Sequence, residues 1–364
     1  MVANLEDLPI REDLKGRKPY GAPQLAVPVA LNVNENTHRI PEEVAVDIIG
    51  RLAAAVLDIN RYPDREFLAL RAALANYLDS NLTAENIWAA NGSNEVLQHI
   101  LQAFGGPGRK ALGFGPTYSM YGLIAQGTGT EYIDSPRLDR FELTPEHISA
   151  EILKHKPNIV MLCSPNNPTG TPLSQSSIEA AYDAVTKATG GIVVVDEAYA
   201  EFGANTEVSA ITLLQGRERL LVSRTMSKAF AFAGARVGYL AADPAVVDAL
   251  RLVRLPYHLS AFTQAAAEAA LDHSKTMLAT VADIRYQRDR IVIELKDMGL
   301  DPYRSEANFV LFGGLDDPNK IFEELLAKGV LVRNVGIPGT LRVSAGTEAE
   351  TTAFLSALRQ VLKK

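Results

Sequence analysis

Short apolar runs, each followed by polar residues, decide the fold class of this chain. The runs are NIWAA, KALGF, NIVMLC, GIVVVD and RLLVSR, and the polar segments after them include NGSNE, GPTYSMY, SPNNPTG and TMSKAF. Short continuous apolar strands that alternate with helical patterns predict a parallel sheet buried on both faces. Ligands of such sheets lie outside the carboxyl ends of the strands. The polar segments are therefore the candidate functional residues.

The rest of the chain predicts a large domain, a smaller domain and an arm. Amphipathic patterns predict helices over residues 41–59 and 65–79. Further strand and helix patterns between NFVLF and the C-terminus predict a second α/β unit, as expected because single cores rarely grow beyond about 250–300 residues. We expect an extended arm (residues 1–33) associated with the small domain, a large domain (34–250) and a small domain (251–364).

Composition excludes several classes of protein. The formal net charge of −7 and the absence of a basic patch argue against nucleic-acid binding. No apolar stretch is long enough to span a membrane, and the N-terminus lacks the pattern of a signal peptide. The single cysteine, Cys163, excludes an internal disulfide and fits a reducing compartment, so we expect a cytoplasmic protein. The histidines lack metal-ligand spacing, and no GxGxxG, Walker or GxSxG motif is present.

The segment IVVVDEAY ends a β-branched run with a carboxylate, Asp196. A partly desolvated carboxylate requires a cationic partner. Asp196 is either a structural cap of the next turn or the partner of a pyridinium nitrogen, which it would keep protonated. Tyr199, three residues later, could reach the phenolic oxygen of the same ring.

Two further segments carry hydrogen-bond donors. CSPNNPTG is either a simple turn or a loop whose Asn167 contacts that phenolic oxygen, and Asn167–Pro168 is a candidate cis peptide bond. NGSNE places Gly92, Ser93 and Asn94 where a helix begins. Their backbone amides suit an anion, although Ser93 or Asn94 could equally cap the helix.

The segment TMSKAFAFAGAR places Lys228 among apolar and small residues. Either the lysine reaches out to solvent, or its amine lies in a pocket, where desolvation lowers the pKa and favours Schiff-base chemistry. Thr225, Ser227 and Arg236 could bind a phosphate. Together with Asp196, Asn167 and Tyr199, these residues supply every group that pyridoxal phosphate requires.

With these residues in view, the chain resembles the fold-type I pyridoxal-phosphate-dependent aminotransferases of class I/II, within them the branch that acts on histidinol phosphate. NRYPD, NGSNE, PTYSMY, CSPNNPTG, VVDEAYAEF, RTMSKAFAFAGARVGY, LPYHLS and SEANFVLF occur in the family's order. Asn94 stands where many members have aspartate. The resemblance implies a mostly parallel sheet between helices, plus a smaller α/β domain.

The resemblance also assigns roles to residues. It implies that Lys228 holds pyridoxal 5'-phosphate as a Schiff base and then acts as general base. Asp196 would pair with the ring nitrogen, and Asn167 and Tyr199 would hold the phenolic oxygen. The other implied cofactor contacts are Tyr118 against the ring and Gly92, Ser93, Asn94, Thr225, Ser227 and Arg236 at the phosphate. Tyr62 would reach that phosphate from the partner subunit of a homodimer, and Tyr20, Asn34, Arg333 and Arg342 would bind the substrate.

The implied reaction is transamination between L-histidinol phosphate and 2-oxoglutarate, which gives imidazole-acetol phosphate and L-glutamate in histidine biosynthesis. Three alternatives remain. An aromatic amino-acid (phenylalanine) aminotransferase shares the framework, a threonine-phosphate decarboxylase uses a similar scaffold, and a regulator could retain the fold without catalysis. No metal is expected.

Overall fold

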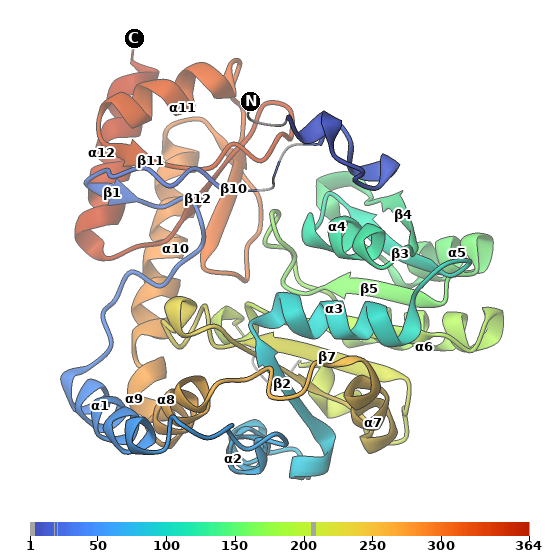
Figure 1. Cartoon of the computed structure of the whole chain (residues 1–364). Helices are drawn as coiled ribbons and strands as arrows, with labels where there is room; N and C mark the ends of the chain where they lie inside the picture. The colour runs from blue at the N-terminus through green and yellow to red at the C-terminus, as the bar shows by residue number, and fades with distance from the viewer. Residues whose placement is uncertain (1–3, 18, 20, 205–208, 364) are drawn as a thin grey trace.

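The largest element of the computed structural model, which describes residues 4–17, 19, 21–204 and 209–363, is a seven-stranded sheet (Figure 1). Its order is β2 (Ile87–Asn91), β8 (Val237–Ala241), β7 (Leu220–Thr225), β6 (Ile192–Asp196), β5 (Ile159–Cys163), β3 (Lys110–Gly115) and β4 (Glu131–Pro136). β8 is antiparallel to both neighbours, and the other pairs are parallel. The predicted, mostly parallel sheet is confirmed. The apolar runs missed β8 and the edge strand β4, which carries Glu131 and Asp134.

Helices cover both faces of this sheet. Along β5, Ile159, Met161 and Cys163 belong to one core, and Val160 and Leu162 belong to the other. This alternation follows from the period of two in a strand. Helices α3 (Ser93–Phe104), α4 (Met120–Gly127) and α7 (Pro244–Val253) contribute to the first core, and α5 (Pro145–His155) and α6 (Gln175–Ala188) contribute to the second.

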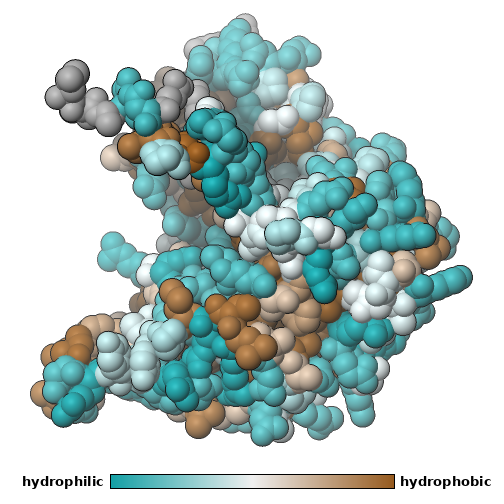
Figure 2. Space-filling view, turned by 45° about the vertical axis from the view of Figure 1, so that its right-hand side comes forward, coloured by the Kyte–Doolittle hydropathy of each residue, from teal (hydrophilic) through white to brown (hydrophobic). Residues whose placement is uncertain are grey.

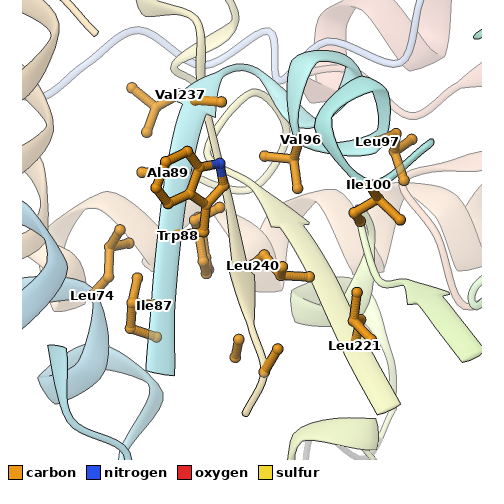
Figure 3. Packing of buried hydrophobic residues seen from close by; sticks show 14 of the residues in the cluster. Leu74, Ile87, Trp88, Ala89, Val96, Leu97, Ile100, Leu221, Val237 and Leu240 are labelled. Carbon is orange, nitrogen blue, oxygen red and sulfur yellow. The ribbon is translucent and has the colours of Figure 1, made fainter. Parts of the chain in front are cut away.

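The first core contains the single tryptophan, Trp88 of β2, which is fully buried. Figure 3 shows its indole beside Leu240, Val96 and Val237. Truncation of a buried aromatic side chain typically costs about 3–5 kcal/mol, so this contact fixes β2 and α3 firmly. The position of the start of α3 is therefore fixed by packing in this core.

The same core extends to the helices that precede and follow the sheet. α1 (Glu42–Leu57) and α2 (Leu68–Leu78) confirm the two helices predicted from amphipathic patterns. α8 (Ala261–Asp272) packs on both, and α9 (Ser274–Leu278) follows it. The division of the chain at residue 250 stays a prediction, and the packing of α8 favours a boundary further along the chain.

A second body packs around a three-stranded antiparallel sheet. Its strands are β9 (Asp301–Pro302), β10 (Phe309–Gly313) and β12 (Leu341–Ser344), and its helices are α10 (Thr280–Asp297), α11 (Pro318–Ala327) and α12 (Glu348–Leu362). β1 (Val29–Ala30) pairs in parallel with β11 (Val330–Leu331). The residues after β1 remain attached, because Ser344 donates its amide to the Leu31 carbonyl. The chain from Asn32 to Asn34 is thereby held beside the small sheet.

Short 3-10 helices complete the described elements: Leu5–Asp7, Glu12–Leu14, Ala84–Asn86, Asp139–Phe141, Ala200–Phe202, Ala210–Leu213 and Ala233–Ala235. Across the described ranges, no helix has both the length and the apolar character that a membrane crossing needs.

Candidate active site

A cavity of about 430 Å³ lies at the carboxyl ends of β5, β6 and β7 and is also lined by the small sheet and the residues after β1. The sequence-predicted residues that line it are Asn34, Ser93, Asn94, Tyr118, Asn167, Asp196, Tyr199, Thr225, Ser227, Lys228, Arg236, Arg333 and Arg342. Gly92 and Tyr62 do not line it, and Tyr20 lies outside the described residues. The polar segments at the strand ends thus converge on one cavity.

Lys228 lies in the turn after β7 and lines the cavity with its amine. The Nζ atom donates a hydrogen bond to the Val33 carbonyl at 3.1 Å and lies 5.9 Å from the centre of the Tyr199 ring. Burial, assisted by the positive charge of Arg342, lowers the pKa of Lys228 to about 8. The direction agrees with the lowering predicted for a buried lysine, and about a tenth of the amine is neutral at pH 7.

Asp196 ends β6 with a carboxylate that is only 2% exposed. Its Oδ2 atom accepts a hydrogen bond from the Tyr121 hydroxyl at 2.8 Å, whereas Oδ1 is buried and has no partner among the described residues. Burial raises the pKa of Asp196 to about 6, although the Tyr121 hydroxyl and the Ala198 amide oppose the rise. A buried carboxylate oxygen without a partner suits a protonated ring nitrogen at the cavity wall.

The Tyr199 hydroxyl accepts hydrogen bonds from two side-chain amides. Asn34 donates at 3.0 Å and Asn167 donates at 3.4 Å. The peptide bond between Asn167 and Pro168 is cis, which confirms the prediction from CSPNNPTG. Asn34, which the resemblance assigned to the substrate, therefore also contacts a residue assigned to the cofactor.

One end of the cavity is built for an anion. Helix α3 begins after Gly92, whose φ is 84°, and no side chain of the described residues caps it, so Ser93 and Asn94 do not act as the cap. The positive φ explains the glycine, and a Cβ atom at Gly92 would also meet the guanidinium of Arg236. Arg236 also donates to the Ser227 hydroxyl at 3.3 Å. An uncapped helix start beside an arginine and a serine is a favourable phosphate site.

Two predicted residues support this end indirectly. The Thr225 hydroxyl donates to the Val237 carbonyl and accepts from the Ser227 amide, so it holds the turn that carries Ser227. The Asn94 side chain accepts a hydrogen bond from the Tyr118 hydroxyl at 3.0 Å. A hydrogen bond thus connects Asn94, at the start of α3, to Tyr118, the tyrosine predicted to lie against the ring.

A second arginine lies elsewhere in the cavity wall. Arg342 of β12 is 7% exposed, and its guanidinium donates to Asn167 Oδ1 at 2.6 Å and to the Asn32 carbonyl at 2.8 Å. Arg333 pairs with Arg342 through the backbone and lines the same cavity. Tyr62, by contrast, is 79% exposed and stacks on Tyr257 with ring centres 4.4 Å apart.

The sequence did not reveal three buried contacts around the site. Two of them are the hydrogen bond from the Tyr121 hydroxyl to Asp196 and the hydrogen bond from Lys228 to the Val33 carbonyl. The third is the pairing of Arg224 with Glu197 and Glu201, which ties the residue before Thr225 to the residue after Asp196. For the third contact, the only signals in the sequence were the charged residues within DEAYAEF and SRTMSK.

The cavity fits pyridoxal 5'-phosphate on these observations. Lys228 supplies an amine of lowered pKa, Asp196 an unpartnered buried oxygen, and the start of α3 with Arg236 an anion site. The described residues contain no cluster of histidine, cysteine, aspartate or glutamate that could hold a metal ion.

Comparison with known proteins gives the same family. The model of the family "Aminotransferase class I and II" matches residues 27–358. The chain is 62% identical to a histidinol-phosphate aminotransferase of Paenarthrobacter aurescens, over 99% of this chain and 97% of that protein. It is 54% identical to one of Thermobifida fusca, over 98% and 96%.

Solved structures agree. The histidinol-phosphate aminotransferase of Sinorhizobium meliloti in complex with pyridoxal-5'-phosphate superimposes with a TM-score of 0.84 at 27% identity, covering 93% of this chain and 91% of that one. The aspartate aminotransferase of Thermus thermophilus with maleate gives 0.78 at 25% identity, covering 92% and 91%. The chain therefore belongs to the class I and II aminotransferases, among the histidinol-phosphate aminotransferases.

Proposed function

We propose that this chain is a pyridoxal-phosphate-dependent transaminase that moves an amino group between L-histidinol phosphate and 2-oxoglutarate. The products are imidazole-acetol phosphate and L-glutamate, in histidine biosynthesis. The observation that carries the proposal is the second arginine site. Arg236 lies at the end of the cavity that is suited to the cofactor phosphate, and Arg342 and Arg333 line another part of its wall, where they would meet a substrate anion. The names of the relatives support the same substrate.

The residues at the cavity wall would hold the cofactor. When bound, pyridoxal 5'-phosphate supplies an aldehyde that accepts the amino group and a ring that withdraws electrons. Lys228 would hold the aldehyde carbon, Asp196 the ring nitrogen, and Tyr199 with Asn167 the phenolic oxygen. Tyr118 would lie against the ring. The phosphate would be held by Ser93, Asn94, Ser227 and Arg236, with Gly92 and Thr225 shaping that end.

Lys228 is the group that moves the proton. Once its amine is free, the neutral lysine would take a proton from the substrate carbon. It would then donate that proton to a second carbon atom within the same site. A lysine with a pKa of about 8 reaches this neutral form far more often than one with an ordinary pKa near 10.5. Burial therefore prepares the base before substrate arrives.

The substrate end must accept two anions in turn, a phosphate monoester and a dicarboxylate. A guanidinium binds both through its planar pair of donors. We propose Arg342 as the main anion contact, because it is buried and fixed by Asn167 and Asn32, with Arg333, Asn34 and Tyr20 assisting.

Turnover of three amino donors tests this substrate assignment. We expect kcat/KM to be highest for L-histidinol phosphate, very low for histidinol, which lacks the anion, and low for phenylalanine. If phenylalanine equals or exceeds histidinol phosphate, the aromatic aminotransferase assignment replaces ours. Release of carbon dioxide from threonine phosphate would indicate the decarboxylase instead.

We further propose that the working unit is a cytoplasmic homodimer in which Tyr62 serves the partner's cofactor phosphate. Tyr62 is 79% exposed in the single chain, and large apolar side chains near it in the sequence are also exposed. These include Val46, Ile49, Val56, Leu57 and Ile59, and Figure 2 shows apolar patches on an otherwise mostly hydrophilic surface. Apolar surface of this extent usually marks a protein interface.

Hybrid dimers test the shared site. Lys228→Ala and Tyr62→Ala chains, each inactive alone, should regain activity after mixing, because each hybrid contains one intact composite site. The matched control replaces Tyr62→Ala by Tyr286→Ala, an exposed tyrosine on α10, which should be active without mixing. Confirmed subunit exchange without recovered activity would contradict the shared site, as would an active monomer in sedimentation.

A further inference from the structure

Tyr121 stands out among the buried polar side chains that the proposed chemistry leaves without a role. It is 1% exposed and lies in the first turn of α4. Its hydroxyl donates to Asp196 Oδ2 at 2.8 Å, and its ring meets the Tyr118 ring edge-on, with centres 5.6 Å apart. One side chain therefore contacts both the carboxylate proposed for the ring nitrogen and the aromatic ring proposed to lie against the cofactor.

The surroundings of Asp196 show why the hydrogen bond from Tyr121 is important for its charge. Asp196 lies on the face of β6 that carries Ile192 and Val194, which belong to the apolar first core. In the described part of the chain, no lysine or arginine forms an ion pair with it, and Oδ1 has no partner. Tyr121 is thus the side chain that stabilises the ionised carboxylate, and it binds Oδ2 while Oδ1 stays without a partner.

The other groups that face Asp196 do not replace this donor. Cys163 of β5 lines the cavity, and burial raises the pKa of its thiol to about 12, so it stays uncharged. Glu197 is a like charge, but Arg224 neutralises it at 2.8 Å. Arg137 faces Tyr121 and Cys163. Ser223, the partner of Asp196 on β7, is uncharged. Burial also raises the pKa of Tyr121, so its hydroxyl remains a donor.

We propose that Tyr121 is a positioning residue that keeps Asp196 ionised and directs its free oxygen toward the ring nitrogen of the cofactor. The proposal rests on the proposed function, because it concerns the cofactor assigned there. It adds a role for a side chain that is not among the residues lining the cavity. The ring nitrogen stays protonated only opposite a charged carboxylate, so the Tyr121 hydroxyl sets the pH range in which the site binds its cofactor well.

The test is the affinity of the apoenzyme for pyridoxal 5'-phosphate, measured by absorbance titration between pH 5 and pH 9. In the unchanged protein, affinity should fall as the pH drops through about 6, where Asp196 takes up a proton. Tyr121→Phe removes one oxygen and keeps the ring. The midpoint should move upward by about one pH unit, which lowers affinity at pH 6.5 by roughly threefold.

Tyr132→Phe is the matched control. Tyr132 borders the same helix at Gly122, but its hydroxyl lies beside Gly113 on β3. Its removal should leave the midpoint where it is. Replacement of Tyr121 by 3-fluorotyrosine strengthens the donor without changing the fold and should move the midpoint downward, which keeps the proposal testable if the phenylalanine variant folds poorly.

The outcomes separate this proposal from the proposed function. If the unchanged apoenzyme fails to bind pyridoxal phosphate at any pH, the proposed function is wrong. If it binds normally and the midpoints of Tyr121→Phe and the fluorotyrosine protein coincide with that of Tyr132→Phe, the proposal for Tyr121 is overturned. Opposite shifts in the two Tyr121 proteins support it.

Discussion

Two arginines in one cavity are held in different ways. Arg236 is exposed, and it donates hydrogen bonds to Ser227 and to the Ala233 carbonyl, which lie within the same turn between β7 and β8. Arg342 is buried, and its guanidinium reaches Asn167 after β5 and the Asn32 carbonyl after β1. The first site is local to the large sheet, and the second is assembled from three distant parts of the chain.

This difference shows which end of the cavity requires distant parts of the chain to be packed together. An arginine held within one turn of the large sheet is in place whenever that sheet forms. A site that joins β12, the loop after β5 and the segment after β1 exists only while the small body and that segment are correctly placed. Substitutions should therefore separate cofactor binding from substrate binding.

Removal of Lys228, which is proposed both to hold the cofactor and to move the proton, should have the largest effect. Lys228→Ala should lower kcat by more than about 10⁴-fold, because attachment of the cofactor and proton transfer are lost together. The visible absorbance of the bound cofactor should also change. Purified variant that retains both turnover and absorbance would show that another group does this chemistry.

Loss of Arg342 should damage the composite end more than cofactor binding. Arg342→Leu removes contacts to a bound anion worth roughly 1.5–3 kcal/mol each, so kcat/KM should fall about a hundredfold or more for both histidinol phosphate and glutamate. The cofactor dissociation constant should change less than about tenfold. Arg140→Leu, which removes an exposed arginine paired with Asp301, is the control. Equal losses of kcat/KM and of cofactor affinity would show that the two ends of the cavity do not bind independently.

Loss of Arg236 should show the converse pattern. Arg236→Leu should raise the cofactor dissociation constant by roughly tenfold to a hundredfold, since one charge-assisted clamp on the phosphate is lost. At saturating cofactor, the KM for histidinol phosphate should stay within a few-fold of the original value. The comparison fails if KM rises as steeply as the cofactor dissociation constant.

The smallest effect should come from Ser227. Ser227→Ala removes a neutral hydroxyl next to Arg236, and a neutral hydrogen bond contributes about 1 kcal/mol. We expect a roughly fivefold weaker cofactor affinity and unchanged substrate KM. Direct titration of the apoenzyme gives the number, and Ser176→Ala, an alanine substitution at a serine on α6, provides the baseline.

Local pattern and resemblance predicted different parts of this molecule. Continuous apolar runs identified β2, β3, β5, β6 and β7 because these strands are buried on both faces. The position of the polar segments at their ends placed the cavity. The roles of Arg333, Arg342 and Asn34 came from the resemblance alone, because nothing in their local sequence distinguishes them from surface residues.

The rest depends on pairs that are far apart in the chain. Tyr121 and Asp196 are separated by 75 positions, and Lys228 and Val33 by 195. Such contacts are set by how α4 and the segment after β1 pack on the sheet, and the partner of Lys228 is a backbone carbonyl, which any residue supplies. β4 was missed for a simpler reason: an edge strand is not buried continuously and carries charges.

The amide of Asn167 limits how this enzyme can be redesigned. Its nitrogen donates to Tyr199 and its oxygen accepts from Arg342, so both halves of one small group are already committed. An aspartate there would lose the donor, and a leucine would lose both contacts. Changes of donor preference introduced around Arg342 must therefore leave this asparagine in place, and directed evolution of the pocket would be most productive at positions that do not share it.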